Sequence, residues 1–159
     1  MSDIASICSG KRPTSIKEGT IPLIGAGGIM GYIDDYNFNE PILVTGRVGT
    51  HGVIQRFEEM CWASDNTLVI KSQRYEFVYQ FLKTVDFSLL NRGSTQPLIT
   101  QTDLNNLPVF IPPVDEIERF ETMANAIMHP YSLNRKEIEQ LRVLSLTLVN
   151  SLAMNNSSR

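Results

Sequence analysis

Short apolar runs separated by glycine, proline and polar residues fill the first two thirds of the chain. Runs over 21–24, 42–45, 51–56 and 67–70 are each bounded by Gly, Pro, Asp or Asn, and such runs are typical of strands. Over 75–85, apolar residues recur three and four positions apart, which predicts a helix. The pattern also predicts a short helix over 3–8, a helical turn over 102–105 and a strand over 108–111.

The last third has a different pattern, without glycine, and it predicts a helical tail that begins at Asp115 after Pro112 and Pro113. His129 and Pro130 are expected to interrupt the tail, with Asn134 capping a second helix. In that helix apolar residues repeat at heptad-like spacing over about two heptads, with Ser145 at the missing position. This surface is too apolar to stay bare, so we expect it to dimerise or to dock a partner subunit. Its candidate residues are Ile138, Leu141, Leu144, Leu148 and Leu152.

Composition narrows the class of protein. The net charge of −3 argues against a protein that holds DNA by charge alone, but the first hundred residues are near neutral, so a local basic surface is still possible there. No apolar run is long enough to cross a membrane, and no signal-peptide core is present, so a cytoplasmic protein is expected. The two cysteines are expected to be reduced.

Motifs for catalysis, metals and nucleotides do not emerge. The glycine-rich stretch 25–31 has Met30 where a dinucleotide fingerprint needs glycine, so turns or a bulge are the better interpretation. Neither His51 nor His129 has metal-ligand spacing. Cys61 stands beside Trp62 and is expected to be a buried thiol, with the aromatic residues Trp62, Tyr32 and Phe38 in the core. The chain is therefore predicted not to be an enzyme by itself.

Two polar loops are candidates for binding. In the stretch 45–52, glycines flank Arg47, and Arg47, Thr50 and His51 could reach a phosphate or a base edge; alternatively, Arg47 pairs with an internal carboxylate and organises the turn. The loop 91–97 carries further donors, although it could equally be an ordinary solvated connection. Lys11 and Arg12 form a small basic cluster that could likewise be plain surface.

Taken in order, four segments carry a resemblance to a known family. These are IPLIGAGGIMGYIDDY, the PILV entry to GRVGTHG, CWASDNTLVI, and GSTQPLITQTDLNNLPVFIPPVDEIERF. Together they resemble a target-recognition domain of the specificity (S) subunit of type I restriction–modification systems. The resemblance runs from about Asp3 to Phe120, and the tail is similar to the spacer helix that follows such domains.

The resemblance implies an α+β fold: a twisted, mostly antiparallel β target-recognition domain with short helices over 1–113, followed by a coiled-coil-like helical tail over 114–159. It implies a non-catalytic subunit that reads one half of a split target in double-stranded DNA. The methyltransferase (M) subunits would dock on it and bring in the restriction/translocase (R) subunit. S-adenosylmethionine and ATP are expected on those partners. Such subunits usually carry two recognition domains, so two copies of this chain could dimerise through their tails.

The same resemblance makes the polar loops candidates for contacting DNA. The DNA-binding candidates are Lys11, Arg12, Arg47, Thr50, His51, Lys71, Gln73, Arg74, Arg92, Ser94, Thr95 and Gln96. Two alternatives stay open. The chain could be a silent, docking-only half-subunit, or it could be the detached recognition domain of a single-chain restriction–methylation enzyme.

Overall fold

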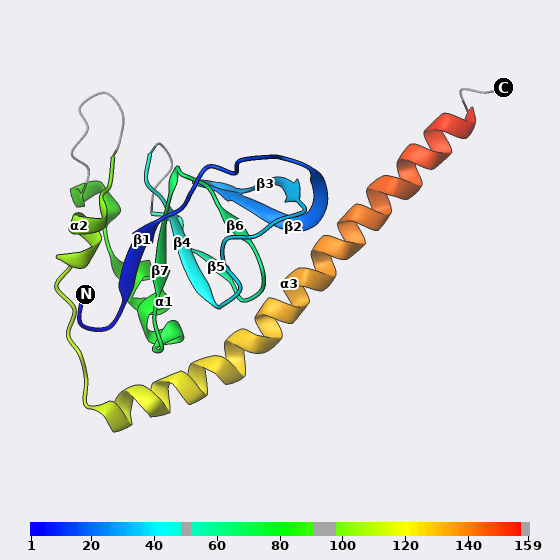
Figure 1. Ribbon diagram of the computed structural model, residues 1–159. Helices are drawn as coiled ribbons and strands as arrows, with labels where there is room; N and C mark the ends of the chain where they lie inside the picture. Colours follow the sequence, from blue (N-terminus) through cyan, green and yellow to red (C-terminus); the bar gives the residue numbers. More distant parts are fainter. Residues whose placement is uncertain (49–51, 91–97, 157–159) are drawn as a thin grey trace. The chain divides into compact units, whose positions relative to one another are not determined.

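The computed structural model describes residues 1–48, 52–90 and 98–156. These residues form two β-sheets, whose strands alternate along the chain, and three α-helices. The four-stranded sheet has the order β1 (Ser6–Ser9), β7 (Thr67–Lys71), β4 (Ile42–Gly46) and β5 (Gln55–Phe57), with every neighbouring pair antiparallel. The three-stranded sheet has the order β3 (Gly28–Ile33), β2 (Glu18–Gly25) and β6 (Trp62–Ala63). Only β2 and β6 run parallel among these strands of the described segments (Figure 1).

The helices occupy the later part of the chain. They are α1 (Tyr75–Thr84), a 3-10 turn over Phe87–Leu90, α2 (Gln101–Asn105) and the long α3 (Val114–Asn156). A capping box begins α2: the Thr100 hydroxyl accepts from the backbone N–H of Asp103, and the Asp103 carboxylate accepts from the backbone N–H of Thr100. The predicted fold class is confirmed, since mostly antiparallel sheets with short helices precede a long C-terminal helix.

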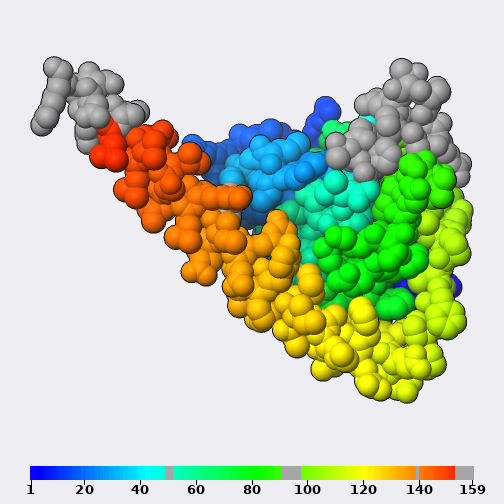
Figure 2. Space-filling view, turned by 180° about the vertical axis from the view of Figure 1, so that it is seen from behind, coloured from blue at the N-terminus to red at the C-terminus, as the bar shows by residue number. Residues whose placement is uncertain are grey.

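The core follows from the two-residue period of the central strands. Leu43 of β4 and Ile70 of β7 pair across the sheet and face the layer that includes α1, α2 and the 3-10 turn. Their neighbours Val44 and Val69 also pair, and they face a second cluster that contains Ile24 of β2. All five of these side chains are fully buried. Figure 2 shows the face on which the green helical segment covers the cyan strands.

Several predicted elements are wrong. The segment 3–8 does not form a helix, because Ser6–Ser9 instead pairs with β7 as strand β1. The predicted strand over 51–56 is reduced to Gln55–Phe57 among its described residues, and 108–111 has no regular structure. Of the predicted core aromatics, Trp62 is buried and Phe38 is half-buried, but Tyr32 is exposed.

The tail is also different from its prediction, because α3 is continuous. Pro130 lies inside the helix, and Asn134 is an interior helical residue, not a cap. A proline removes one backbone hydrogen bond, and the long helical segments on either side tolerate that loss.

By internal contacts the chain divides into Met1–Glu118 and Arg119–Arg159. Ile117, at the start of α3, is buried in the first unit. The functional division at 113/114 stays a prediction.

Candidate nucleic-acid interface

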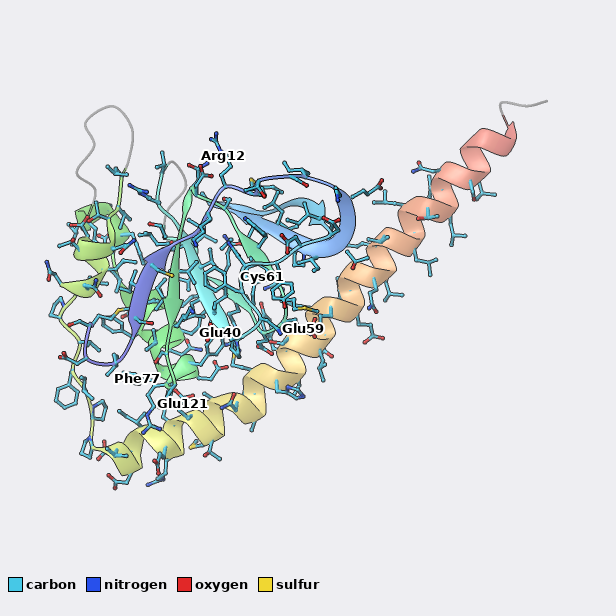
Figure 3. All side chains as sticks on the ribbon, viewed as in Figure 1. Arg12, Glu40, Glu59, Cys61, Phe77 and Glu121 are labelled. Carbon is cyan, nitrogen blue, oxygen red and sulfur yellow. The ribbon has the colours of Figure 1, made fainter. Side chains whose placement is uncertain are left out.

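Three basic residues predicted as DNA contacts come together at one end of the four-stranded sheet. The backbone N–H of Lys11 donates to the carbonyl of Ala63 at 2.9 Å, which lays the segment 10–12 along the residues that precede β7. The backbone N–H of Arg47 donates to the carbonyl of Asn66 at 2.8 Å. Lys11, Arg12 and Arg47 therefore flank one turn, and we call them the basic end; Figure 3 labels Arg12 there.

Gly10 allows the segment 10–12 to pass close to the turn that precedes β7. Its backbone N–H donates to the carbonyl of Thr67 at 3.1 Å. A Cβ at this position would stand 2.1 Å from the carbonyl oxygen of Ser64 and 2.5 Å from that of Ala63. The next turn is fixed by the Thr67 hydroxyl, which donates to the carbonyl of Ser64 at 2.6 Å. Only glycine lets the backbone at Gly10 pass this close to the turn.

The guanidinium of Arg12 lies 3.3 Å from the Asp65 carboxylate, but 82% of the Arg12 side chain is exposed. An ion pair this exposed contributes little and can be exchanged for a phosphate. Arg47 is half-buried and lies next to Ile99, whose backbone N–H donates to the Arg47 carbonyl at 3.0 Å. The basic end is thus held by backbone hydrogen bonds, with Lys11 and Arg12 exposed and Arg47 half-buried.

The candidates Lys71, Gln73 and Arg74 lie elsewhere, at and beyond the opposite end of β7. Thr67 to Lys71 spans about 13 Å of extended chain. The Lys71 ammonium donates to the Glu40 carboxylate at 2.6 Å and lies 5.1 Å from the centre of the Phe38 ring. These three residues are therefore not part of the basic end.

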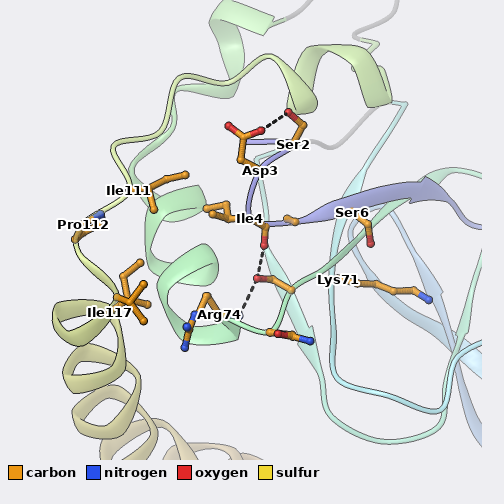
Figure 4. Close-up of a pocket in the computed structure, with 13 residues that line it drawn as sticks. Ser2, Asp3, Ile4, Ser6, Lys71, Arg74, Ile111, Pro112 and Ile117 are labelled. Atoms are coloured by element: carbon orange, nitrogen blue, oxygen red, sulfur yellow. Dashed lines mark hydrogen bonds between the residues drawn. The ribbon is translucent and has the colours of Figure 1, made fainter.

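Lys71, Gln73 and Arg74 instead line a shallow groove of about 490 Å³ (Figure 4). The segments 2–6, 71–74 and 111–117 form its walls, and they include both polar and apolar side chains. Arg74 lies 3.7 Å from the Glu118 carboxylate beside this groove. The six remaining DNA-binding candidates, Thr50, His51, Arg92, Ser94, Thr95 and Gln96, lie outside the described residues.

A buried ion pair between β5 and α1 escaped the sequence analysis. The guanidinium of Arg56 donates to both carboxylate oxygens of Glu76, each at 2.5 Å, and to Glu58 at 3.0 Å. The rings of Tyr75 and Tyr79 lie 5.0 and 4.7 Å from it. Burial works against the charged form of Arg56, but the hydrogen bonds that it donates to Glu76 and Glu58 outweigh burial and raise its pKa. From the sequence, Glu58 and Glu59 are interpreted as solvated turn acids, but the half-buried Glu58 accepts a hydrogen bond from Arg56, whereas Glu59 is exposed.

The glycine-rich stretch forms a turn, as predicted. It connects β2 and β3, and Gly28 has φ +150°, a conformation that favours glycine. Cys8 and Cys61 are free, and burial raises the pKa of Cys61 to about 11, which keeps its thiol protonated. Among the described residues, His, Cys, Asp and Glu form no group able to hold a metal ion. Within the same described segments, no helix is long and apolar enough to cross a membrane.

Comparison with known proteins identifies the fold first. The chain is similar to the S subunit of a type I restriction–modification system from M. genitalium, with a TM-score of 0.66 and 17% identity over 77% of this chain. It is also similar to the HsdS subunit from Thermoanaerobacter tengcongensis, with a TM-score of 0.57 and 14% identity over 83% of this chain. A chain from a study of complex assembly in the type I R-M system gives a TM-score of 0.60 at 16% identity over 87% of this chain.

The sequence matches agree with the fold. The EcoprrI type I restriction enzyme specificity subunit of Escherichia coli is 23% identical over 117 residues, or 67% of this chain. The family model described as the type I restriction modification DNA specificity domain matches residues 1–142. The chain belongs to this family, whose domain is the non-catalytic specificity part of a type I system. It spans 29% of the E. coli subunit and 36–40% of the three solved chains.

Proposed function

We propose that this chain reads one half of a split DNA target for a type I restriction–modification complex and performs no chemistry of its own. The observation that carries the proposal is the basic end, where the exposed Lys11 and Arg12 and the half-buried Arg47 lie on a backbone that hydrogen bonds tie to the turn before β7. Arginine on such a scaffold can bind a phosphate or the edge of a guanine. A domain of this family needs such a surface to select DNA.

The partners follow from the same proposal. Methyltransferase subunits bind S-adenosylmethionine and bring in the ATP-dependent restriction subunit, while this chain supplies target selection. Two copies pair through α3 to assemble two recognition domains. The long helix supports both tasks, because apolar residues lie exposed on two sides of it. Leu133, Val143 and Leu146 lie outside the heptad positions and leave a second surface for docking methyltransferase.

Substitutions at the two ends of β7 test the proposed DNA surface. In complexes assembled with the methyltransferase subunit from the same locus, Arg12→Ala and Arg47→Ala are expected to weaken DNA binding. Loss of a phosphate contact weakens binding to all DNA sequences and lowers, by about one, the slope of the logarithm of the binding constant against the logarithm of the salt concentration. Loss of a base contact instead relaxes specificity at one position of the target. Lys71→Ala is the matched control and leaves both quantities unchanged, provided that its melting temperature shows it folded.

Equal losses of DNA affinity in Lys71→Ala and Arg12→Ala would contradict the assignment of the basic end as the DNA-binding surface. A docking-only role is the second candidate, and the pairing of Lys71, a predicted DNA contact, with Glu40 favours it. That role predicts co-purification with methyltransferase that depends on α3, and no sequence-selective DNA binding in any variant.

A further inference from the structure

The hairpin of β2 and β3 lies beside the basic end. The backbone N–H of Ser64, in the turn that precedes β7, donates to the carbonyl of Ile24 at 3.0 Å. The Gln55 amide donates to the carbonyls of Gly25 and Ala26 at 2.9 and 3.3 Å. These hydrogen bonds hold the hairpin turn next to the turn that the basic end flanks (Figure 1).

A β-bulge in this hairpin places Met30 outside the strand pairing. Leu23 of β2 pairs with Gly31 of β3. Ile24, the next residue of β2, pairs with Ile29, so Met30 has no partner residue on β2. Its side chain is 60% exposed. Bulges change the direction of a side chain and are frequent beside functional sites, so the backbone of the hairpin sets the direction of Met30.

Gly25 leaves the space that the Met30 side chain occupies. A Cβ on Gly25 would stand 2.5 Å from the Met30 sulfur and 2.7 Å from its Cγ. The thioether therefore lies over the backbone at Gly25, and the Gln55 amide fixes that backbone through the Gly25 carbonyl. Because the side chain is positioned before a ligand binds, a contact with it costs little conformational entropy.

The hairpin turn carries no charge that would repel a phosphate. From 19 to 33 the sequence has no Asp, Glu, Lys or Arg. The acidic residues nearest to this segment in the sequence are Glu18, Asp34 and Asp35, at the other end of the hairpin. Gly28 to Asp34 spans about 20 Å of extended strand. DNA held at the basic end can therefore lie across the turn without repulsion from the hairpin.

The C5-methyl group of thymine is the apolar group that the major groove offers to a side chain such as Met30. Apolar side chains contact this methyl group and thereby distinguish thymine from the other bases. Contacts with phosphates position a protein on the duplex, and the basic end can supply them beside the hairpin. The unbranched thioether adapts its shape to such a contact and needs no hydrogen bond.

We propose that Met30 is a specificity-determining residue of this chain, which selects an A·T pair by contacting the C5-methyl group of thymine in the major groove. Gly25 and Gln55 are positioning residues, because they hold the Met30 thioether in place. This inference rests on the proposed reading of DNA, and it adds an apolar base contact to the charged contacts of the basic end.

Replacement of thymine by uracil tests the contact in complexes assembled with the methyltransferase subunit from the same locus. The probe is a duplex that contains the motif found by methylation sequencing, with each thymine of either strand replaced in turn by deoxyuridine. At one position, loss of the methyl group is expected to lower the affinity of the unsubstituted chain about fourfold, the effect of one buried methyl group. In Met30→Ala the same replacement is expected to have little effect, because the side chain that contacts the methyl group is gone.

Gly25→Ala displaces the Met30 thioether without removing it. The added Cβ meets a flexible side chain and not backbone, so this variant is expected to fold, which its melting temperature checks, and to lose the preference for thymine over uracil. Met60→Ala is the matched control and keeps the fourfold preference. Met60 is 44% exposed and lies two residues before β6, which runs parallel to β2 towards the hairpin turn, so it is at the other end of both strands.

A fourfold preference for thymine that persists in Met30→Ala would overturn the inference. So would an unsubstituted chain that binds its motif equally well with uracil at every position. Loss of methyltransferase binding in Met30→Ala, but not in Met60→Ala, would assign the hairpin to a protein interface and overturn it as well. A chain that selects no DNA sequence would instead overturn the proposed function itself, so the two failures are distinguishable.

Discussion

Gln55 and Arg56, two neighbours on the short strand β5, tie that strand to different layers of the molecule. The Gln55 amide donates to the carbonyls of Gly25 and Ala26, at the turn between β2 and β3. Arg56 points to the opposite face and binds Glu76 on α1. Successive strand residues face opposite sides, so β5 can hold the hairpin and the helix at once.

Breaking the Arg56–Glu76 pair is expected to destabilise the fold strongly. Arg56→Met leaves the Glu76 carboxylate, which is 1% exposed, without its guanidinium, and the free energy of unfolding should fall by about 3–5 kcal/mol. The double variant Arg56→Met/Glu76→Leu removes both charges and should recover much of that loss. Urea unfolding of the two single variants and the double variant measures the coupling, and strictly additive losses would refute it.

A substitution at Gly10 tests the close packing of its backbone against the carbonyls of Ala63 and Ser64 at the basic end. Gly10→Ala drives a methyl group into the carbonyls of Ser64 and Ala63 and should cost about 1–3 kcal/mol of unfolding free energy. Gly31→Ala is the matched control, because its added Cβ meets no atom within 4 Å, and it should change stability by less than about 0.5 kcal/mol. Equal melting temperatures for the two variants would contradict the packing described at Gly10.

At the scale of elements, the local sequence pattern predicts a helix or strand correctly where that pattern alone determines the element. The helix predicted over 75–85 and the strands predicted over 42–45 and 67–70 are present as α1, β4 and β7 with ends that differ by one residue, because their apolar period is strong and breakers bound them. The segment 3–8 was predicted as a helix, but Ser6–Ser9 pairs with β7, whose residues lie far away in the sequence. Long-range pairing overrides a weak local preference, and a local pattern does not contain it.

The interior proline of α3 is a second case, because the rule that proline interrupts a helix gives the wrong prediction there. Pro130 costs about 3 kcal/mol in an isolated helix interior, yet the helix continues on both sides. Pro130→Ala is therefore expected to raise the thermal stability of α3 and of the proposed dimer, measured by circular dichroism at several concentrations. Gln140→Ala, an exposed helical substitution, controls for helix propensity alone. An unchanged or lower melting temperature for Pro130→Ala would show that the proline is accommodated by a specific contact.

At the scale of the whole molecule, the net charge of −3 is compatible with a local basic surface, which the basic end provides. Sequence reasoning found Lys11, Arg12 and Arg47 but grouped them with Lys71 and Arg74, which lie at or beyond the other end of β7. The pairing of the strands places these two groups of residues at opposite ends of β7, and this long-range pairing cannot be inferred from the sequence alone. The Arg56–Glu76 pair was missed for the same reason, because its two residues belong to different elements.

The central claim is that this chain selects the DNA sequence that its complex modifies. Methylation sequencing of DNA from a host that expresses the chain with the methyltransferase subunit from its own locus tests this claim most directly. We predict a new split methylated motif that is absent without the chain, and a palindromic one if two copies pair. The absence of any new motif, despite stable co-purification with the methyltransferase subunit, would contradict the claim.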